Sequence, residues 1–230
     1  MDLRFHEYPT REALAEGLAT GLAAVLATAI DARGAATLAV SGGSTPRLLF
    51  ERLSQADIEW DRVCVLLVDE RWVDEDSDRS NARLVRSGLL VGRAAKARFE
   101  PFFVPGRTAA EAAPDLSERF GALARPLDAA ILGMGNDGHT ASLFPGSRDL
   151  PRALASTHPY VSLDATGCPV ANEWTLRITL TPHGLAKVGT RLLLLRGQKK
   201  LDVLQQALEG DDELQHPVLA AIRTPGARLR

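Results

Sequence analysis

The order of elements in this sequence predicts an α/β fold, with a doubly wound, mostly parallel sheet and helices on both faces. Residues 62–68 and 129–132 are short, nearly continuous apolar runs, which are typical of strands buried on both faces. Segments with helical spacing alternate with such runs, and this alternation predicts parallel strands joined by helices. No internal repeat, low-complexity tract or linker divides the 230 residues, so we expect one domain over 1–230.

The N-terminal part is expected to form a long helix over 11–32. Six apolar residues recur there at helical spacing, Thr10 is suited to cap the start, and Gly34 is suited to end it. A strand over 37–40 then leads into the turn Ser41-Gly-Gly-Ser-Thr-Pro46. Pro46 is suited to the first position of the next helix, which runs to about residue 55 with Thr45 as its cap.

The rest of the chain continues the alternation, except that 147–173 shows little periodicity. The expected elements are a strand over 62–68, a charged loop over 69–79, a helix over 80–90, a strand over 99–104, a helix over 108–123 that Pro114 can break, strands over 128–134 and 174–180, a helix over 182–187, a strand over 190–195, a helix over 201–208 and a closing strand over 217–222.

Composition excludes several classes of protein. The formal net charge of -2 gives no overall attraction to nucleic acid or to an acidic membrane surface. Two cysteines are too few for a disulfide framework, and no four-ligand cluster of cysteine and histidine predicts structural zinc. The N-terminus lacks a signal-peptide pattern, and no run approaches the ~20 apolar residues of a membrane span. We therefore expect a cytoplasmic protein without nucleic-acid or membrane partners.

The turn Ser41-Gly-Gly-Ser-Thr-Pro46 is the first candidate site. A strand, two glycines (Gly42 and Gly43) and a helix start present free backbone N–H groups, which favour an anion such as phosphate. Ser44 and Thr45 add hydroxyl donors. The alternative is a tight turn whose glycines only satisfy steric needs.

Two other turns carry positive charge after a strand. In Asp69-Glu-Arg-Trp72, Arg71 can clamp an oxyanion, and the alternative is a solvated charged loop. The solvated-loop alternative is stronger for Arg79 and Arg83. In Gly197-Gln-Lys-Lys200, lysines stand near a helix start, where they are unfavourable unless an anion binds. This pattern does not say which lysine acts.

The segment from Asp128 to Gly146 carries the strongest catalytic signal. An apolar strand is followed by three glycines that permit an irregular turn, and Asp137 and His139 stand inside it. The unperturbed pKa of histidine suits proton transfer near neutrality. The alternative for His139 is a hydrogen-bonded structural histidine. Because the carboxyl ends of parallel strands share one edge, we expect all four turns to converge there.

These motifs resemble those of the glucosamine-6-phosphate isomerase/6-phosphogluconolactonase family, and of its 6-phosphogluconolactonases in particular. The segments that carry the resemblance, across nearly the whole chain, are Ser41-Gly-Gly-Ser-Thr-Pro46, Val68-Asp-Glu-Arg71, Leu132-Gly-Met-Gly-Asn-Asp-Gly-His-Thr-Ala-Ser-Leu-Phe-Pro-Gly146, Arg177-Ile-Thr-Leu-Thr181 and Gly197-x-x-Lys200. The resemblance implies a Rossmann-like sheet, a 6-phosphosugar lactone of the pentose phosphate pathway as substrate, no metal and no organic cofactor.

The resemblance also implies roles for residues. His139 would draw a proton from the water that attacks the lactone carbonyl, and Asp137 would orient the imidazole. The phosphate would bind to the turn from Gly42 to Thr45, with Lys200 and Arg71 as countercharges. Lys200 is preferred over Lys199 because the family lysine stands three residues after the glycine. Asp69 would have a supporting role, and we expect a monomer.

Two alternatives differ from a lactonase in specific ways. A glucosamine-6-phosphate deaminase carries an acidic residue five positions after the histidine, where this chain has Phe144, which transfers no proton. A non-catalytic sugar-phosphate sensor needs only the anion turn and usually carries a DNA-binding segment. This chain keeps Asp137 and His139 and has no spare length for a helix-turn-helix. Lactone hydrolysis is therefore the predicted activity.

Overall fold

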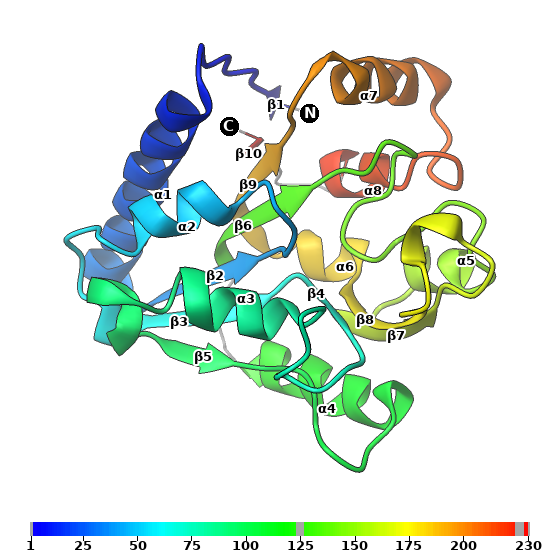
Figure 1. Ribbon diagram of the computed structural model, residues 1–230, viewed down its shortest axis with the longest axis horizontal. Coiled ribbons are helices and arrows are strands. Elements are labelled where there is room, and N and C mark those ends of the chain that lie inside the picture. Colours follow the sequence, from blue (N-terminus) through cyan, green and yellow to red (C-terminus); the bar gives the residue numbers. More distant parts are fainter. Residues whose placement is uncertain (1, 123–126, 224–227, 230) are drawn as a thin grey trace.

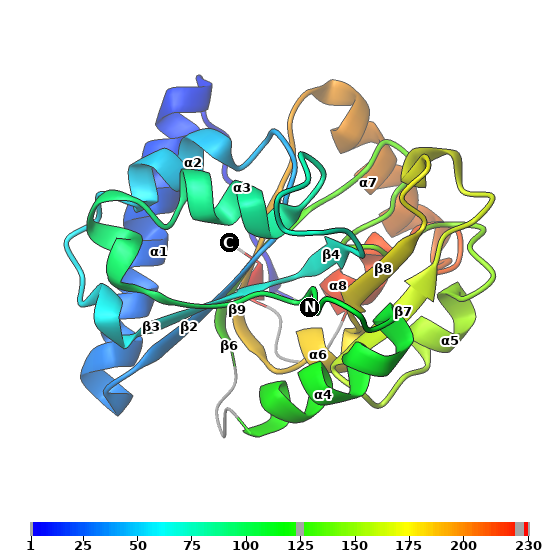
Figure 2. The same ribbon diagram turned by 60° about the horizontal axis from the view of Figure 1, so that its bottom comes forward.

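A seven-stranded parallel sheet forms the centre of the computed structural model, which describes residues 2–122, 127–223 and 228–229 (Figures 1 and 2). Its strands lie in the order β1-β10-β9-β6-β2-β3-β5, and each neighbouring pair is parallel. The strands are β1 (Asp2–Leu3), β2 (Ala36–Val40), β3 (Val63–Leu67), β5 (Arg98–Glu100), β6 (Leu127–Gly133), β9 (Val188–Leu194) and β10 (Arg228–Leu229). The predicted mostly parallel sheet is confirmed.

Helices cover both faces of this sheet: α1 to α3 lie on one side in Figure 2, and α4 and α6 on the other. The helices are α1 (Arg11–Arg33), α2 (Arg47–Leu53), α3 (Asn81–Gly88), α4 (Ala109–Ala122), α5 (Leu150–Leu154), α6 (Pro182–Leu185), α7 (Gln198–Gly210) and α8 (Val218–Arg223). The predicted cap of α1 is confirmed, since Ala13 N donates to Thr10 Oγ1 at 3.0 Å. Its predicted end is confirmed as well, because Gly34 is left-handed with φ 77°.

By length and composition alone, α1 is apolar enough to cross a membrane. The expectation that no such segment exists is therefore wrong for this helix. Leu22, Leu26 and Ile30 of α1 are buried in the main hydrophobic cluster of the protein. Packing against the sheet accounts for their apolar character.

A second, three-stranded antiparallel sheet, in the order β4-β8-β7, lies beside the first. It consists of β4 (Asp69–Arg71), β8 (Leu176–Leu180) and β7 (Tyr160–Asp164). The predicted charged loop over 69–79 therefore begins as a strand, and the region 147–173 contains α5 and β7. Local periodicity missed β4 because its residues are charged, whereas pairing with β8 supplies their backbone hydrogen bonds.

Four further sequence expectations are corrected. The closing strand expected over 217–222 is instead the helix α8 (Val218–Arg223), preceded by Pro217, because a short, fully buried apolar run suits either element, and here it packs against Met134 and Leu204. Pro46, not Thr45, holds the N-cap position of α2, with no side-chain cap. The strand expected over 99–104 is only the short β5. Pro114 lies within α4, which continues to Ala122; Leu123 lies outside the described residues.

The strands that carry the candidate motifs end at one level. Val40, the last residue of β2, pairs with Leu67 of β3 and with Ile131 of β6. The strand order reverses between β2 and β6, because β3 continues the sheet on one side and β9 on the other. Ligands of open α/β sheets bind at such a point, beyond the carboxyl ends of the strands.

Candidate active site

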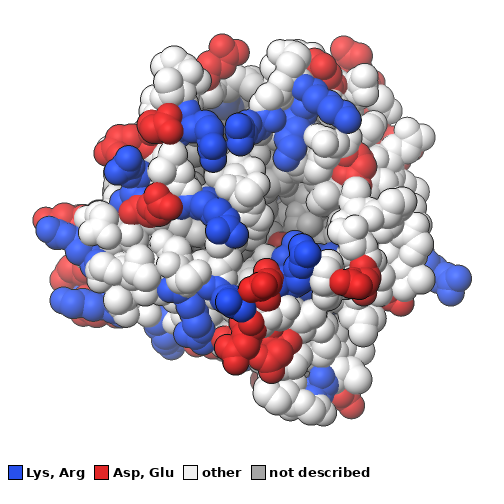
Figure 3. Space-filling view, in the orientation of Figure 1, with Lys and Arg blue, Asp and Glu red and all other residues white. Residues whose placement is uncertain are grey.

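A cavity of about 300 Å³ lies at the carboxyl ends of β2, β3, β6 and β9. Eight residues predicted from the sequence line it: Gly42, Gly43, Ser44, Thr45, Asp69, Arg71, His139 and Lys200. Figure 3 shows this face of the molecule hollowed near its centre, with Lys and Arg side chains around the hollow. The four turns therefore converge as expected, and Asp137 joins them through its contact with His139.

The turn after β2 depends on its two glycines for different reasons. Gly43 has φ 94°, in the left-handed region that favours glycine. At Gly42 a Cβ would overlap the Asn81 side chain, so the turn and the start of α3 are in direct contact. Ser41 Oγ is buried and makes no hydrogen bond within the part of the chain that the structure describes.

The loop after β6 is closed by its own hydrogen bonds. Gly135 N donates to His139 O at 2.9 Å, and Thr140 Oγ1 donates to Gly133 O at 2.8 Å. A Cβ on Gly135 would overlap both the His139 ring and the Asp137 carboxylate. Gly138, with φ 80°, accepts a hydrogen bond from Val218 N at 3.0 Å. The glycines therefore allow this loop to fold tightly around the two polar side chains.

Asp137 and His139 form a close pair at the cavity wall. The distance from Asp137 Oδ1 to His139 Nδ1 is 2.5 Å, and the side chains are 30% and 25% exposed. Burial raises the pKa of the Asp137 carboxyl group, but the hydrogen bond and charge of His139 outweigh it and hold that pKa below its ordinary value. A carboxylate on Nδ1 leaves Nε2 of His139 as the nitrogen that can accept a proton.

Strand β4 contributes Asp69 and Arg71 from within the small sheet. Asp69 is buried, and its Oδ2 accepts a hydrogen bond from Ser142 Oγ at 2.5 Å. Arg71 donates from Nη1 to Arg79 O at 2.6 Å and to Asn81 Oδ1 at 3.2 Å. No carboxylate lies within ion-pair distance of Arg71 among the described residues. Its charge is therefore available to an anion in the cavity.

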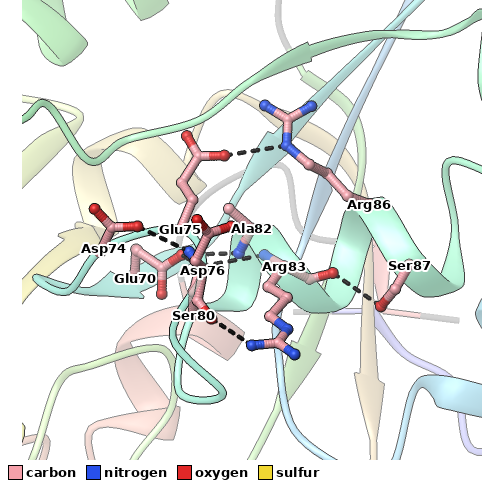
Figure 4. Close-up of polar contacts among 9 residues, drawn as sticks. All are labelled: Glu70, Asp74, Glu75, Asp76, Ser80, Ala82, Arg83, Arg86 and Ser87. Atoms are coloured by element: carbon pink, nitrogen blue, oxygen red, sulfur yellow. Dashed lines mark hydrogen bonds and ion pairs between the residues drawn. The ribbon is translucent and has the colours of Figure 1, made fainter.

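Glu70, between these two residues, points away from the cavity and ties β4 to the start of α3 (Figure 4). Its carboxylate accepts from the backbone N–H groups of Arg71, Asn81 and Ala82, each at 2.8 Å. Burial raises the pKa of Glu70 to about 7, against the opposing effect of these hydrogen bonds. The carboxylate satisfies amides at the N-terminus of α3 and fixes the position of that helix relative to β4.

Lys200, the third residue of α7, is the lysine that reaches the cavity, whereas Lys199 is exposed. Burial lowers the pKa of Lys200, and the negative charge of Asp137 opposes that shift. Of the two lysines that the sequence pattern left open, Lys200 is the one that lines the cavity. Asp137 and Lys200 lie near enough for their charges to interact.

The cavity wall also includes residues that were not among the predicted site residues, and three of them bear on its chemistry: Asn81, Phe144 and Arg177. The Phe144 ring lies 4.8 Å from the His139 ring, centroid to centroid, and is buried. Arg177 is 4% exposed. The resemblance included Arg177 and Phe144 without a binding role, and Asn81 carried no signal of its own.

Arg79 and Arg83 lie outside the cavity lining. The Arg79 guanidinium stacks on the Trp174 ring at 4.3 Å. Arg83 forms an ion pair with Asp78 at 2.9 Å and donates to Asp76 O (Figure 4). Both arginines therefore agree with the alternative given for them in the sequence analysis, which is a charged surface loop with internal contacts. Within the described residues, no group of three or more His, Cys, Asp or Glu side chains could hold a metal ion.

Comparisons with known proteins agree with this arrangement. The family model described as glucosamine-6-phosphate isomerases/6-phosphogluconolactonase matches residues 9–228. The chain is 48% identical to a 6-phosphogluconolactonase of Xylella fastidiosa (strain 9a5c), over 94% of this chain and 90% of that protein. It is 44% identical to a 6-phosphogluconolactonase of Rhizobium meliloti (strain 1021), over 100% and 98% of the two chains.

A solved structure has the same fold. The crystal structure of a 6-phosphogluconolactonase from Shewanella baltica OS155 superposes with a TM-score of 0.91 at 41% identity. The superposition covers 99% of this chain and 97% of the other.

Proposed function

Since the chain belongs to the glucosamine-6-phosphate isomerase/6-phosphogluconolactonase family, we propose that it hydrolyses 6-phospho-D-glucono-1,5-lactone to 6-phospho-D-gluconate. The observation that carries the proposal is that His139, which is paired with Asp137, and the turn from Gly42 to Thr45 line one cavity. A base and an anion site in one cavity suit a substrate with a phosphate at one end and a reactive carbonyl at the other.

The turn from Gly42 to Thr45 and Lys200 bind the phosphate, and Arg71 adds a second positive charge. Holding this remote group orients the ring and brings its C1 carbonyl to His139. His139 takes a proton from water as the water oxygen attacks C1. Asp137, on Nδ1, keeps the imidazole in the tautomer that can accept this proton and stabilises the imidazolium that forms.

The tetrahedral intermediate then collapses. The bond from C1 to the ring oxygen breaks, and that oxygen takes a proton from His139. The product is the open-chain acid, and His139 returns to its starting state. No metal or organic cofactor takes part in these reaction steps. The steps stay a prediction, as do a cytoplasmic location and a monomeric state.

Ring opening by a deaminase is disfavoured by Phe144. This residue stands where deaminases of the family carry an acid, and its buried ring packs beside His139. A phenyl ring transfers no proton, so this chain lacks the acid that the deaminases carry at that position.

The test compares the wild type with His139→Ala on freshly prepared 6-phosphogluconolactone, after the spontaneous rate has been subtracted. Loss of the general base is expected to lower kcat by about 10²-fold or more. His158→Ala is the matched control, because His158 is exposed, and it should keep full activity. An unchanged kcat in folded His139→Ala would refute the role of His139 as the base.

A further inference from the structure

Two arginines face each other on the cavity wall. Arg71 of β4 is the direct cross-strand partner of Arg177 of β8, so both side chains lie on the same face of the small sheet, and both line the cavity. Like charges in this position destabilise a strand pair. No carboxylate lies within ion-pair distance of Arg177 in the described part of the chain. Within the described residues, the positive charges of these two arginines are therefore not neutralised by ion pairs.

Arg177 is fixed in position by neutral groups. Its Nε donates to Trp174 O at 2.6 Å and its Nη2 to Ala171 O at 3.3 Å, while Nη1 makes no hydrogen bond to any described residue. Its guanidinium carbon lies 5.3 Å from the centre of the Phe144 ring. A cation that is 4% exposed and has free N–H groups towards a cavity is costly unless an anion binds there.

Contacts give the order of residues around the wall. Gly42 of the turn touches Asn81, Asn81 bonds to Arg71, and Arg71 is opposite Arg177. From Arg177 the wall continues to Phe144 and then to His139. In this order Arg71 is the arginine nearer to the turn from Gly42 to Thr45, and Arg177 is the arginine nearer to the imidazole, with Phe144 between them.

We propose that Arg177 binds the oxygen on C1: the carbonyl oxygen of the lactone, the oxyanion of the tetrahedral intermediate and then the carboxylate of the product. This inference rests on the proposed function. When water adds to C1 and His139 takes its proton, negative charge collects on that oxygen, and a fixed guanidinium stabilises it without reorganisation. When the bond to the ring oxygen breaks, the oxyanion becomes the carbonyl oxygen of the acid, and the ring oxygen takes the proton from His139. The acid then loses its own proton to solvent, and the resulting C1 carboxylate lies opposite the same guanidinium.

The experiment uses two ligands that share the phosphate and differ at C1. 6-Phosphogluconate has a carboxylate there, and glucitol 6-phosphate has a neutral hydroxymethyl group. Dissociation constants for both are measured by calorimetry with the wild type, Arg177→Met and Arg177→Lys. Methionine keeps a flexible apolar stem against Phe144, and lysine keeps the charge.

The wild type is expected to bind 6-phosphogluconate more tightly than glucitol 6-phosphate. In Arg177→Met this preference should disappear while glucitol 6-phosphate binds as before, and kcat for the lactone should fall about 10²-fold. Arg177→Lys should recover part of the preference. A general structural role would weaken both ligands alike, and this result would overturn the proposal.

Two other results also overturn it: a preference that survives in Arg177→Met, and a wild type that hydrolyses the lactone but shows no preference. Failure of the proposed function is a separate result. It would appear in the wild type as absence of lactone hydrolysis above the spontaneous rate.

Discussion

Strands β2 and β3 of the large sheet differ from strands β4 and β8 of the small one in how they serve the cavity. All residues of β2 and β3 are buried, and nearly all are apolar. These strands contribute through the turns that follow them. By contrast, β4 and β8 place buried polar side chains within the strands themselves: Asp69, Glu70, Arg177 and Thr179.

The comparison separates scaffold from site. In the large sheet the strands supply burial and a common edge, and chemistry is added after each strand ends. In the small sheet the pairing of β4 with β8 sets the positions of charged groups, so the strands are part of the cavity wall. Substitutions in β2 should therefore change stability, and substitutions around β4 and β8 should change function and pH response.

The largest expected effect is in the large sheet. Leu38, at the centre of β2, is fully buried, and Leu38→Ala should lower the free energy of unfolding by about 4 kcal/mol through lost burial and a cavity. Denaturant unfolding measures this loss. The kcat/KM per folded molecule should stay unchanged well below the melting temperature, and a clear fall would contradict the division between scaffold and site.

The next effect concerns Glu70 and pH. Its pKa of about 7 in the folded protein exceeds the ordinary value of an unfolded glutamate, so the folded state binds more protons between these pKa values. Protonated Glu70 therefore makes its full contribution to the free energy of unfolding below the pKa that this residue has in the unfolded chain. The contribution, about 3 kcal/mol in all, is lost as pH rises to about 7.

Unfolding of the wild type and Glu70→Gln, measured from pH 4 to 8, checks this effect. Glutamine does not titrate, so the stability of the wild type relative to the variant should decline over that range. Parallel pH profiles of the two proteins would show that Glu70 does not change its protonation state there.

A smaller effect tests the loop after β6. Gly135→Ala would place a methyl group on the His139 ring and the Asp137 carboxylate, so kcat should fall about 10²-fold through misplacement of the base. Gly21→Ala is the control, because Gly21 lies within α1 with open space around it. It should raise stability by about 1 kcal/mol and leave kcat unchanged. Equal kcat in both variants would argue against a tightly fitted loop.

The smallest effect concerns phosphate binding by α7. Lys200→Ala removes a positive charge from the cavity and should raise KM about tenfold with little change in kcat, because a remote contact binds substrate and transition state equally. Lys199→Ala is the matched control on the exposed side of the same helix turn and should leave KM unchanged. A fall in kcat alone for Lys200→Ala would contradict its phosphate role.

The sequence by itself determined the parallel sheet and the four turns, and it placed Asp137 and His139 within one of these turns. These depend on local signals: continuous apolar runs, glycines where the backbone turns tightly, and polar residues directly after a strand. The signals need no knowledge of what lies opposite in space.

Only the tertiary structure decided which element a charged segment forms, and whether an apolar segment that suits both a helix and a strand becomes one or the other. Asp69 and Glu70 are typical of a loop by sequence, yet they lie in a strand because β8 and the start of α3 supply their partners. Val218 to Ile222 suit a strand as well as a helix, and packing around Met134 and Leu204 selects the helix. Arg177 acquires its place beside Arg71 in the same way, since the residues that define each environment are distant in the chain.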